Sequence, residues 1–155
     1  MSRAVVIGSD RLGLRVAQQL ERDGVPFAIV ALPGSWLAGA RLPAAWRVLR
    51  AVPDADTLLE AGLGEATDLL ALSDVDEVNL GAALAAREAS PRVRLVLRQF
   101  NTRVAPLLAS HLPEAEILSL SALAAPTFAL AALAPGVLFA QPLAEEALVL
   151  SEVSP

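Results

Sequence analysis

Short apolar runs alternate with amphipathic segments along this chain, and this alternation predicts its main elements. The apolar runs are typical of buried strands, and the longer segments carry apolar residues at helical spacing and end at Gly or Pro. We expect strands at 3–7, 27–31, 46–52, 67–72, 93–98 and 116–118. We expect helices at 12–23, 54–61, 73–89, 101–111 and 119–133, and a C-terminal β-hairpin formed by 137–140 and 147–150.

Strands that alternate with helices in this way predict an α/β fold, a doubly wound parallel sheet of the Rossmann-like kind with six strands. Right-handed crossovers place its ligand crevice at the carboxyl ends of the first and fourth strands. We expect one domain over residues 1–134. Residues 135–155 are then a tail or hairpin, or the start of a truncated further domain.

The turn after the first strand has the layout of a dinucleotide-binding motif, G-x-G-x-x-G, with Asp10 in place of the middle glycine. In the functional interpretation Gly8 makes the tight turn, Gly13 lets the helix pack closely on the strand, and free amides face a phosphate. The candidate phosphate site is the whole turn: Gly8, Ser9, Asp10, Arg11, Leu12 and Gly13.

Asp10 leaves two interpretations of this turn open. As a helix cap, its carboxylate would contribute about 1 kcal/mol and occupy the anion site from within. It would then repel a phosphate about 4 Å away by about 4 kcal/mol at an effective dielectric constant of about 20. That repulsion weakens binding about a thousandfold. The alternative is that Arg11 or Arg15 neutralises Asp10 and that the site still binds.

Other turns at the expected crevice are polar to different degrees. The turn after the second strand, 31–34, has no carboxylate for a ribose and no arginine for a 2′-phosphate. After the fourth strand, Ser73, Asp74 and Asp76 precede Asn79 by about one helical turn. These side chains could bind a ribose or a metal, but the same spacing describes a serine cap followed by acids that favour the helix dipole.

Arg98 ends the fifth strand and could reach an anion in the crevice, with Arg103 close behind it in the sequence. Surface salt bridging is the alternative for both arginines. His111, the single histidine, stands at a helix end, where a cation is favourable for electrostatic reasons alone.

Composition excludes several chemistries. The formal net charge is −5 and no basic patch is evident, so we expect no nucleic-acid partner. The 12 basic residues are all arginine and cysteine is absent, which excludes a lysine Schiff base, a Walker-type lysine and thiolate chemistry. Absence of cysteine fits a cytosolic protein.

An uncharged run at 117–144 is long enough to cross a bilayer. Pro126, Pro135 and Pro142 divide it into pieces of ordinary helix length, which favours a helix packed on a sheet or on a partner subunit.

From the fourth strand onward the sequence becomes distinctive and resembles the TrkA-N, or RCK N-terminal, family of regulator-of-potassium-conductance domains. The resemblance covers about residues 3–134. It is carried by the segments 70–79, 82–88, 91–98, 100–103 and 118–128.

This resemblance implies a cytoplasmic regulatory module, located at the inner face of the membrane, that gates a potassium channel or transporter. It implies NAD(H) or an adenine nucleotide as cofactor, lying over Gly8–Gly13 with contacts from Ser73 and Arg98. It also implies homodimers or higher oligomers formed through the later helices, 101–111 and 121–133.

The sequence departs from the family pattern where the ligand should lie. Asp10 replaces the central glycine, the acid after the second strand is missing, and Val52 and Pro53 stand where a Gly-Asp pair often follows the third strand. The C-terminal ligand subdomain of many members is missing apart from a beginning in the tail, so we expect a fragment of a larger protein.

These observations lead to a non-catalytic regulatory or assembly domain with an altered or lost dinucleotide site. The alternative is an intact nucleotide sensor in which Arg11, Arg15 or Arg98 compensates for Asp10. A nicotinamide-dependent oxidoreductase is a third hypothesis, but it needs a substrate domain and a proton donor that the sequence does not offer.

Overall fold

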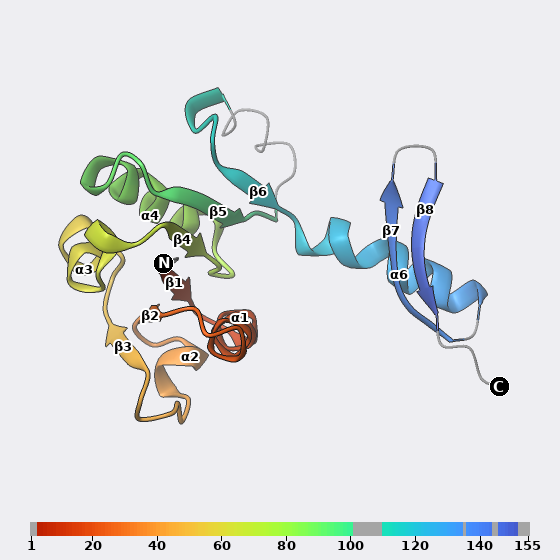
Figure 1. Cartoon of the computed structure of the whole chain (residues 1–155), viewed down its shortest axis with the longest axis horizontal. Helices are drawn as coiled ribbons and strands as arrows, with labels where there is room; N and C mark the ends of the chain where they lie inside the picture. Colours follow the sequence, from red (N-terminus) through yellow and green to blue (C-terminus); the bar gives the residue numbers. More distant parts are fainter. Residues whose placement is uncertain (1–2, 101–109, 135, 144–145, 152–155) are drawn as a thin grey trace. The chain divides into compact units, whose positions relative to one another are not determined.

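The computed structural model describes residues 3–100, 110–134, 136–143 and 146–151. The chain divides into two compact units, 1–117 and 118–155, which are considered separately (Figure 1).

The first unit is built on a six-stranded sheet with the order β3-β2-β1-β4-β5-β6. The pairings of β1 with β2 and β4, of β2 with β3, and of β4 with β5 are all parallel. The strands are β1 (Ala4–Gly8), β2 (Phe27–Ala31), β3 (Arg47–Arg50), β4 (Asp68–Ala71), β5 (Arg94–Arg98) and β6 (Glu116–Leu118). This order confirms the predicted doubly wound, Rossmann-like sheet, whose strand order reverses direction between β1 and β4.

Helices cover both faces of this sheet (Figure 1). On one face Ala17 and Leu37 pack with Ile29 of β2. On the other face Leu58 and Ala82 belong to a larger core that includes residues of β1, β4 and β5. The helices of this unit are α1 (Arg11–Arg22), α2 (Trp36–Gly39), α3 (Ala55–Glu60), the 3-10 turn η1 (Leu63–Glu65) and α4 (Asp76–Ala89).

Helix α2 lies between the predicted strands 27–31 and 46–52, where the sequence pattern predicts no helix. The side chain of Ser35 accepts a hydrogen bond from the amide of Ala38 and caps this single turn. Leu37 is fully buried and anchors the turn under β1 and α1. A helix of this length has no periodicity to detect, and Pro33 and Gly34 beside it indicate a loop.

Helix α4 begins at Asp76, so the prediction that Ser73 caps it is wrong. The N-cap position is Val75, which has no capping side chain. Ser73 instead makes a turn before the helix, where its Oγ accepts a hydrogen bond from the Val75 amide. The amide of Ser73 is already bound to the side chain of Asn79. The predicted acids of the first turn, Asp76 and Glu77, are in place.

The predicted helix at 101–111 falls mostly outside the described residues. Only Ser110 and His111, which are helical, are described.

The second unit contains helix α6 (Leu120–Leu133) and the antiparallel hairpin of β7 (Val137–Leu143) and β8 (Glu146–Ser151), which confirms the predicted hairpin. The Oγ1 atom of Thr127 accepts a hydrogen bond from the Ala140 amide at 2.9 Å and donates one to its carbonyl at 3.1 Å, which ties α6 to β7.

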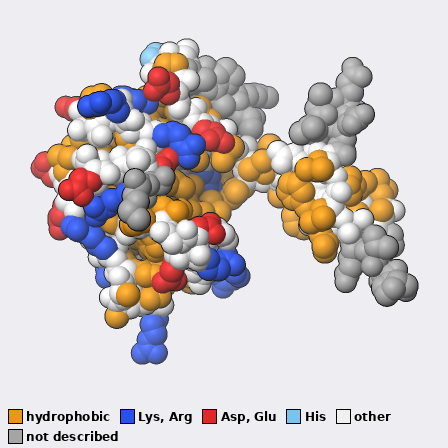
Figure 2. All heavy atoms as spheres, viewed as in Figure 1, with side chains coloured by type: hydrophobic (Ala, Val, Ile, Leu, Met, Phe, Trp, Pro, Cys, Tyr) orange, Lys and Arg blue, Asp and Glu red, His pale blue; other side chains and the backbone are white. Residues whose placement is uncertain are grey.

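Helix α6 is apolar on all sides, yet none of its residues is buried. Phe128 and Leu133 are among its exposed side chains. In the face shown in Figure 2, hydrophobic side chains gather over this unit. Within the described residues, no helix has the length and apolar character needed to cross a membrane.

Candidate functional site

The crevice at the carboxyl ends of β1 and β4 is shaped by two glycines. A Cβ atom on Gly13 would lie 3.2 Å from the Gly8 Cα atom and 3.2 Å from Leu37 Cδ2. A Cβ on Gly8 would lie 2.9 Å from the same Leu37 carbon. A side chain at either position would force its neighbours to shift, so glycine favours this close approach of α1 to β1 beside Leu37, and the predicted packing role of Gly13 is confirmed.

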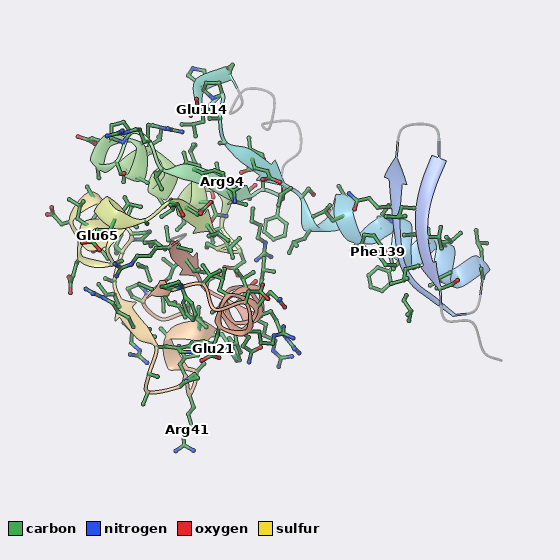
Figure 3. The ribbon with its side chains drawn as sticks, viewed as in Figure 1. Glu21, Arg41, Glu65, Arg94, Glu114 and Phe139 are labelled. Atoms are coloured by element: carbon green, nitrogen blue, oxygen red, sulfur yellow. The ribbon has the colours of Figure 1, made fainter. Side chains whose placement is uncertain are left out.

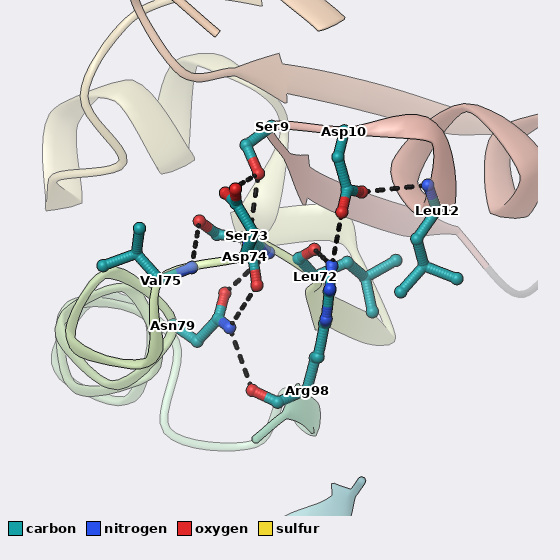
Figure 4. A network of polar contacts seen from close by, with 9 residues as sticks. All are labelled: Ser9, Asp10, Leu12, Leu72, Ser73, Asp74, Val75, Asn79 and Arg98. Carbon is teal, nitrogen blue, oxygen red and sulfur yellow. Dashed lines mark hydrogen bonds and ion pairs between the residues drawn. The ribbon is translucent and has the colours of Figure 1, made fainter. Parts of the chain in front are cut away.

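Asp10 caps α1 from inside the turn. Its backbone is extended, and its Oδ1 atom accepts a hydrogen bond from the Leu12 amide at 2.9 Å. The other carboxylate oxygen accepts a hydrogen bond from Arg98 Nη1 at 2.7 Å (Figure 4). The carboxylate therefore meets a helix N-terminal amide and a guanidinium together, the two partners that a bound phosphate uses at such a turn.

Arg98 reaches Asp10 from the end of β5, and its side chain is only 9% exposed. Its Nη1 atom also donates a hydrogen bond to the Leu72 carbonyl at 3.2 Å, and its guanidinium lies 4.5 Å from the centre of the Phe100 ring. The buried Nε atom has no hydrogen-bond partner. Arg98 is thus a buried cation whose counter-charge is Asp10, not the surface salt bridge considered as the alternative.

Ser9 joins the first turn to the loop after β4. Its hydroxyl donates a hydrogen bond to Asp74 Oδ1 at 2.5 Å and accepts one from the Asp74 amide at 3.0 Å (Figure 4). The hydrogen bond from Ser9 lowers the pKa of Asp74 below its usual value, partly opposed by burial of the carboxyl. Asp74 therefore stays ionised at neutral pH and adds a negative charge to the crevice.

Asn79 holds the ends of β4 and β5 together from inside α4. Its Oδ1 atom accepts a hydrogen bond from the Ser73 amide at 2.8 Å. Its Nδ2 atom donates to the carbonyls of Ser73 and Arg98, each at 2.9 Å. The side chain is fully buried, so Asn79 positions the backbone of Arg98 and is itself inaccessible to a ligand.

Asp74 and Asp76, the two aspartates that follow β4, form hydrogen bonds with different partners. Asp74 binds Ser9, whereas the carboxylate of Asp76 accepts hydrogen bonds from Gln99 Nε2 at 2.8 Å and from the Phe100 amide at 2.9 Å. Among the described residues, no group of three or more acidic or histidine side chains is arranged to hold a metal ion.

A cavity of about 610 Å³ lies beside the crevice, past the ends of β2 and β3. Its walls are mostly apolar and come from the loops after these strands and from one face of α4, with Asp54 and Glu88 as the charged residues. The remaining lining residues are Leu32, Pro33, Val52, Pro53, Ala55, Val78, Gly81, Ala82 and Ala85. The cavity has the size of small-molecule sites.

The structure brings most of the predicted site residues together. Ser9, Asp10, Ser73 and Arg98 belong to one connected network with Asn79 and Asp74 (Figure 4). Arg11 differs, since its guanidinium lies 5.7 Å from the centre of the Trp36 ring. Contact of any of these residues with a nucleotide stays a prediction.

Sequence reasoning missed Leu37, which supports both glycines, and the apolar cavity. The cavity is lined by residues from distant segments, and no local pattern indicates it. Arg11, Arg15 and Arg98 are the arginines considered as partners of Asp10, and Arg98 is the one that pairs with it. Arg103 lies outside the described residues.

Three comparisons bear on this arrangement. A solved structure described as the Shewanella denitrificans Kef CTD in AMP-bound form is similar with a TM-score of 0.64 and 21% identity, covering 85% of this chain and 82% of that one. The GsuK RCK domain and the GsuK channel are similar with TM-scores of 0.60 and 21% identity over 76% of this chain. This chain spans only 25% and 21% of those two.

A search of curated protein sequences gives no match. The sequence model of the TrkA-N domain, however, matches residues 4–112, which include β1 to β5 and the whole crevice. The chain therefore belongs to the TrkA-N domain family.

Proposed function

We propose that this chain is a regulatory and assembly domain of a potassium channel or transporter in which the dinucleotide site is altered. Membership of the TrkA-N family and the fold shared with the GsuK RCK domain support the regulatory role. One observation carries the altered site: the carboxylate of Asp10 caps α1 and pairs with buried Arg98.

The Asp10 carboxylate accepts the hydrogen bonds from the Leu12 amide and from Arg98 that a phosphate at this turn would accept. A nucleotide would have to compete with Asp10 for the Leu12 amide and for Arg98, and its phosphate would approach the Asp10 charge. Because Arg98 neutralises much of the Asp10 charge, the repulsion of about 4 kcal/mol at about 4 Å, equivalent to about a thousandfold weaker binding, is an upper limit. Asp74, ionised beside Ser9, adds to the repulsion.

Assembly is proposed to involve the later helices. A helix that is apolar all round is normally covered, and α6 has no buried residue within this single chain. We expect a second copy of the chain to cover it, in a homodimer or a higher oligomer. The domain would then act in the cytoplasm, at the inner face of the membrane, on the channel or transporter it regulates.

A second candidate function, an intact sensor of NAD(H) or an adenine nucleotide, is favoured by the cavity of about 610 Å³ beside the crevice. An apolar cavity of this size can hold an adenine ring. Arg98 would then exchange Asp10 for a phosphate, and binding energy from the cavity would offset part of the repulsion.

Calorimetry with AMP, ADP, ATP, NAD and NADH separates the two functions. We expect the unmodified chain to bind none of them in the micromolar range, and Asp10→Gly to restore binding, because it frees the Leu12 amide and Arg98. Asp23→Gly is the matched control, since it removes an exposed carboxylate from the opposite end of α1. Micromolar binding of NAD or NADH by the unmodified chain would support the intact sensor. Absence of binding by Asp10→Gly as well would show that self-occupation is not the reason for the loss.

A further inference from the structure

A shallow hollow on the outer face of α1 collects two arginines and a tryptophan. It has a volume of about 320 Å³ and is lined by Arg11, Leu14, Arg15, Gln18 and Trp36. The four helix residues occupy positions i, i+3, i+4 and i+7 and so lie along one side of α1. Gly13 and Ala17, the fully buried residues of the same helix, do not line the hollow, whereas Leu14 also packs against the core on this face of the sheet.

The positive charge in this hollow has no counter-charge in the described part of the chain. The ion pairs there use Arg3, Arg94 and Arg98, and neither Arg11 nor Arg15 takes part in one. Asp10, the acid beside Arg11 in sequence, is held by Arg98. Both Arg11 and Arg15 are exposed to solvent.

Arg11 and Arg15 reduce the stability of α1 when no anion is bound to them. The first turn of α1 has no acidic residue, and a cation there opposes the helix dipole. Like charges four positions apart repel each other by a few tenths of a kcal/mol, roughly as much as an opposite pair attracts. An anion placed between the two guanidinium groups reverses both effects. Features that oppose local stability are expected at functional sites.

We propose that this hollow binds a phosphomonoester. The planar forks of Arg11 and Arg15 match phosphate oxygens, and a phosphomonoester carries enough charge for both. Gln18, one turn beyond Arg15, can bind a neighbouring polar group. Trp36, already in contact with Arg11 at 5.7 Å, provides an apolar face for the group that carries the phosphate. The ligand is either a free phosphate ester or the phosphate headgroup of a lipid.

Trp36 itself can report binding. The chain has two tryptophans, so Trp46→Phe leaves Trp36 as the single fluorophore. Phenyl phosphate tests the free ligand, and vesicles of phosphatidylcholine with and without phosphatidic acid test the lipid. We expect a saturable change of Trp36 emission in at least one arm, and Arg15→Ala to weaken binding about tenfold. Calorimetry with the same probes compares the unmodified chain with Arg15→Ala while Trp46 is kept.

Arg41→Ala is the matched control, because Arg41 is exposed and extends away from the first unit (Figure 3). It should leave the dissociation constant unchanged. Excess NAD, which carries a pyrophosphate but no phosphomonoester, should not compete with phenyl phosphate, which separates this hollow from the crevice and from the proposed function. No saturable change in either arm, equal losses in Arg15→Ala and Arg41→Ala, or competition by NAD would overturn the proposal.

Discussion

The carboxylate of Asp10 lies 2.7 Å from the guanidinium of Arg98, although the two residues are 88 positions apart in the sequence. Asp10 stands at the position where the dinucleotide-binding motif has its middle glycine, and Arg98 ends β5 across the crevice. Because Arg98 is 8% exposed, its charge needs a partner inside the protein, and Asp10 provides it. The same pair caps α1, closes the turn and holds the end of β5.

Replacing Asp10 by Asn tests the stabilising part of this pair. The amide can still cap α1, but the buried guanidinium loses its counter-charge. Because the Asp10 side chain is 32% exposed, we expect a loss of about 1–3 kcal/mol in the free energy of unfolding, less than for a fully buried pair. Urea denaturation measures it. Asp23→Asn should cost far less, and an equal loss in the two variants would contradict the role of the pair.

Gly13→Ala tests the contact between α1 and β1. The added methyl group would lie 3.2 Å from the Gly8 Cα atom, which belongs to the backbone and cannot move aside easily. We expect a loss of about 1–3 kcal/mol in stability. Gly81→Ala on α4 is the matched control, since its methyl group meets nothing within 4 Å. It should stabilise the protein by about 0.4–1 kcal/mol, and a stabilising Gly13→Ala would refute the packing argument.

Asn79→Ala removes the side chain that joins Ser73 and Arg98. It leaves a buried amide and two buried carbonyls without their partner, and a cavity in place of the amide. We expect a loss of about 2–4 kcal/mol in the free energy of unfolding. Thermal denaturation followed by circular dichroism is sufficient to detect it. Glu77→Ala, on the exposed side of the same helix, is the control. A smaller loss of stability in Asn79→Ala than in Glu77→Ala would show that the hydrogen bonds of Asn79 do not stabilise the fold.

The hydrogen bond from Ser9 holds the pKa of Asp74 below its usual value, and this predicts a pH dependence. A carboxyl group whose pKa is lower in the folded state stabilises the fold above its unfolded pKa. That stabilisation is lost as the pH falls through the folded pKa, below about 4. Carbon NMR of the Asp74 carboxyl should show its pKa rising in Ser9→Ala. An unchanged titration would mean that the Ser9 hydrogen bond is not formed in solution.

Phe128→Glu tests assembly through α6. Phe128 is 76% exposed, so the substitution removes no buried contact within the single chain. We expect sedimentation velocity to show an oligomer for the unmodified chain and a monomer for the variant, because a charge cannot be buried in an apolar interface without a partner. Leu59→Glu, an exposed residue of α3, is the control and should leave the oligomer intact. A monomeric unmodified chain would contradict the proposed interface.

Local patterns were sufficient to predict the sheet and most helices. Val5 to Ile7 form a fully buried run, and β-strands of this kind are recognisable without knowledge of their neighbours. Helix α2 could not be predicted, since one turn of helix has no periodicity. The sequence pattern predicts a start of α4 at Ser73, which is too early. The amide of Ser73 is bound by the side chain of Asn79, and this contact forms only in the folded crevice.

The site was predictable in part. Asp10 as a cap follows from its position before α1, and the structure confirms it. Its pairing with Arg98 rather than Arg11 or Arg15 depends on which strand ends meet at the crevice. Sequence alone therefore left three arginines as candidates. The cavity beside α4 is formed by loops from separate strands and could be found only in the structure.

The most direct test of the self-occupied turn is the Leu12 amide resonance in a proton–nitrogen NMR titration with NAD, which carries no phosphomonoester. The account predicts that this resonance does not move in the unmodified chain, because the amide is bound to Asp10, and that it shifts and saturates in Asp10→Gly. A saturating shift of the Leu12 amide in the unmodified chain at micromolar NAD would contradict the account.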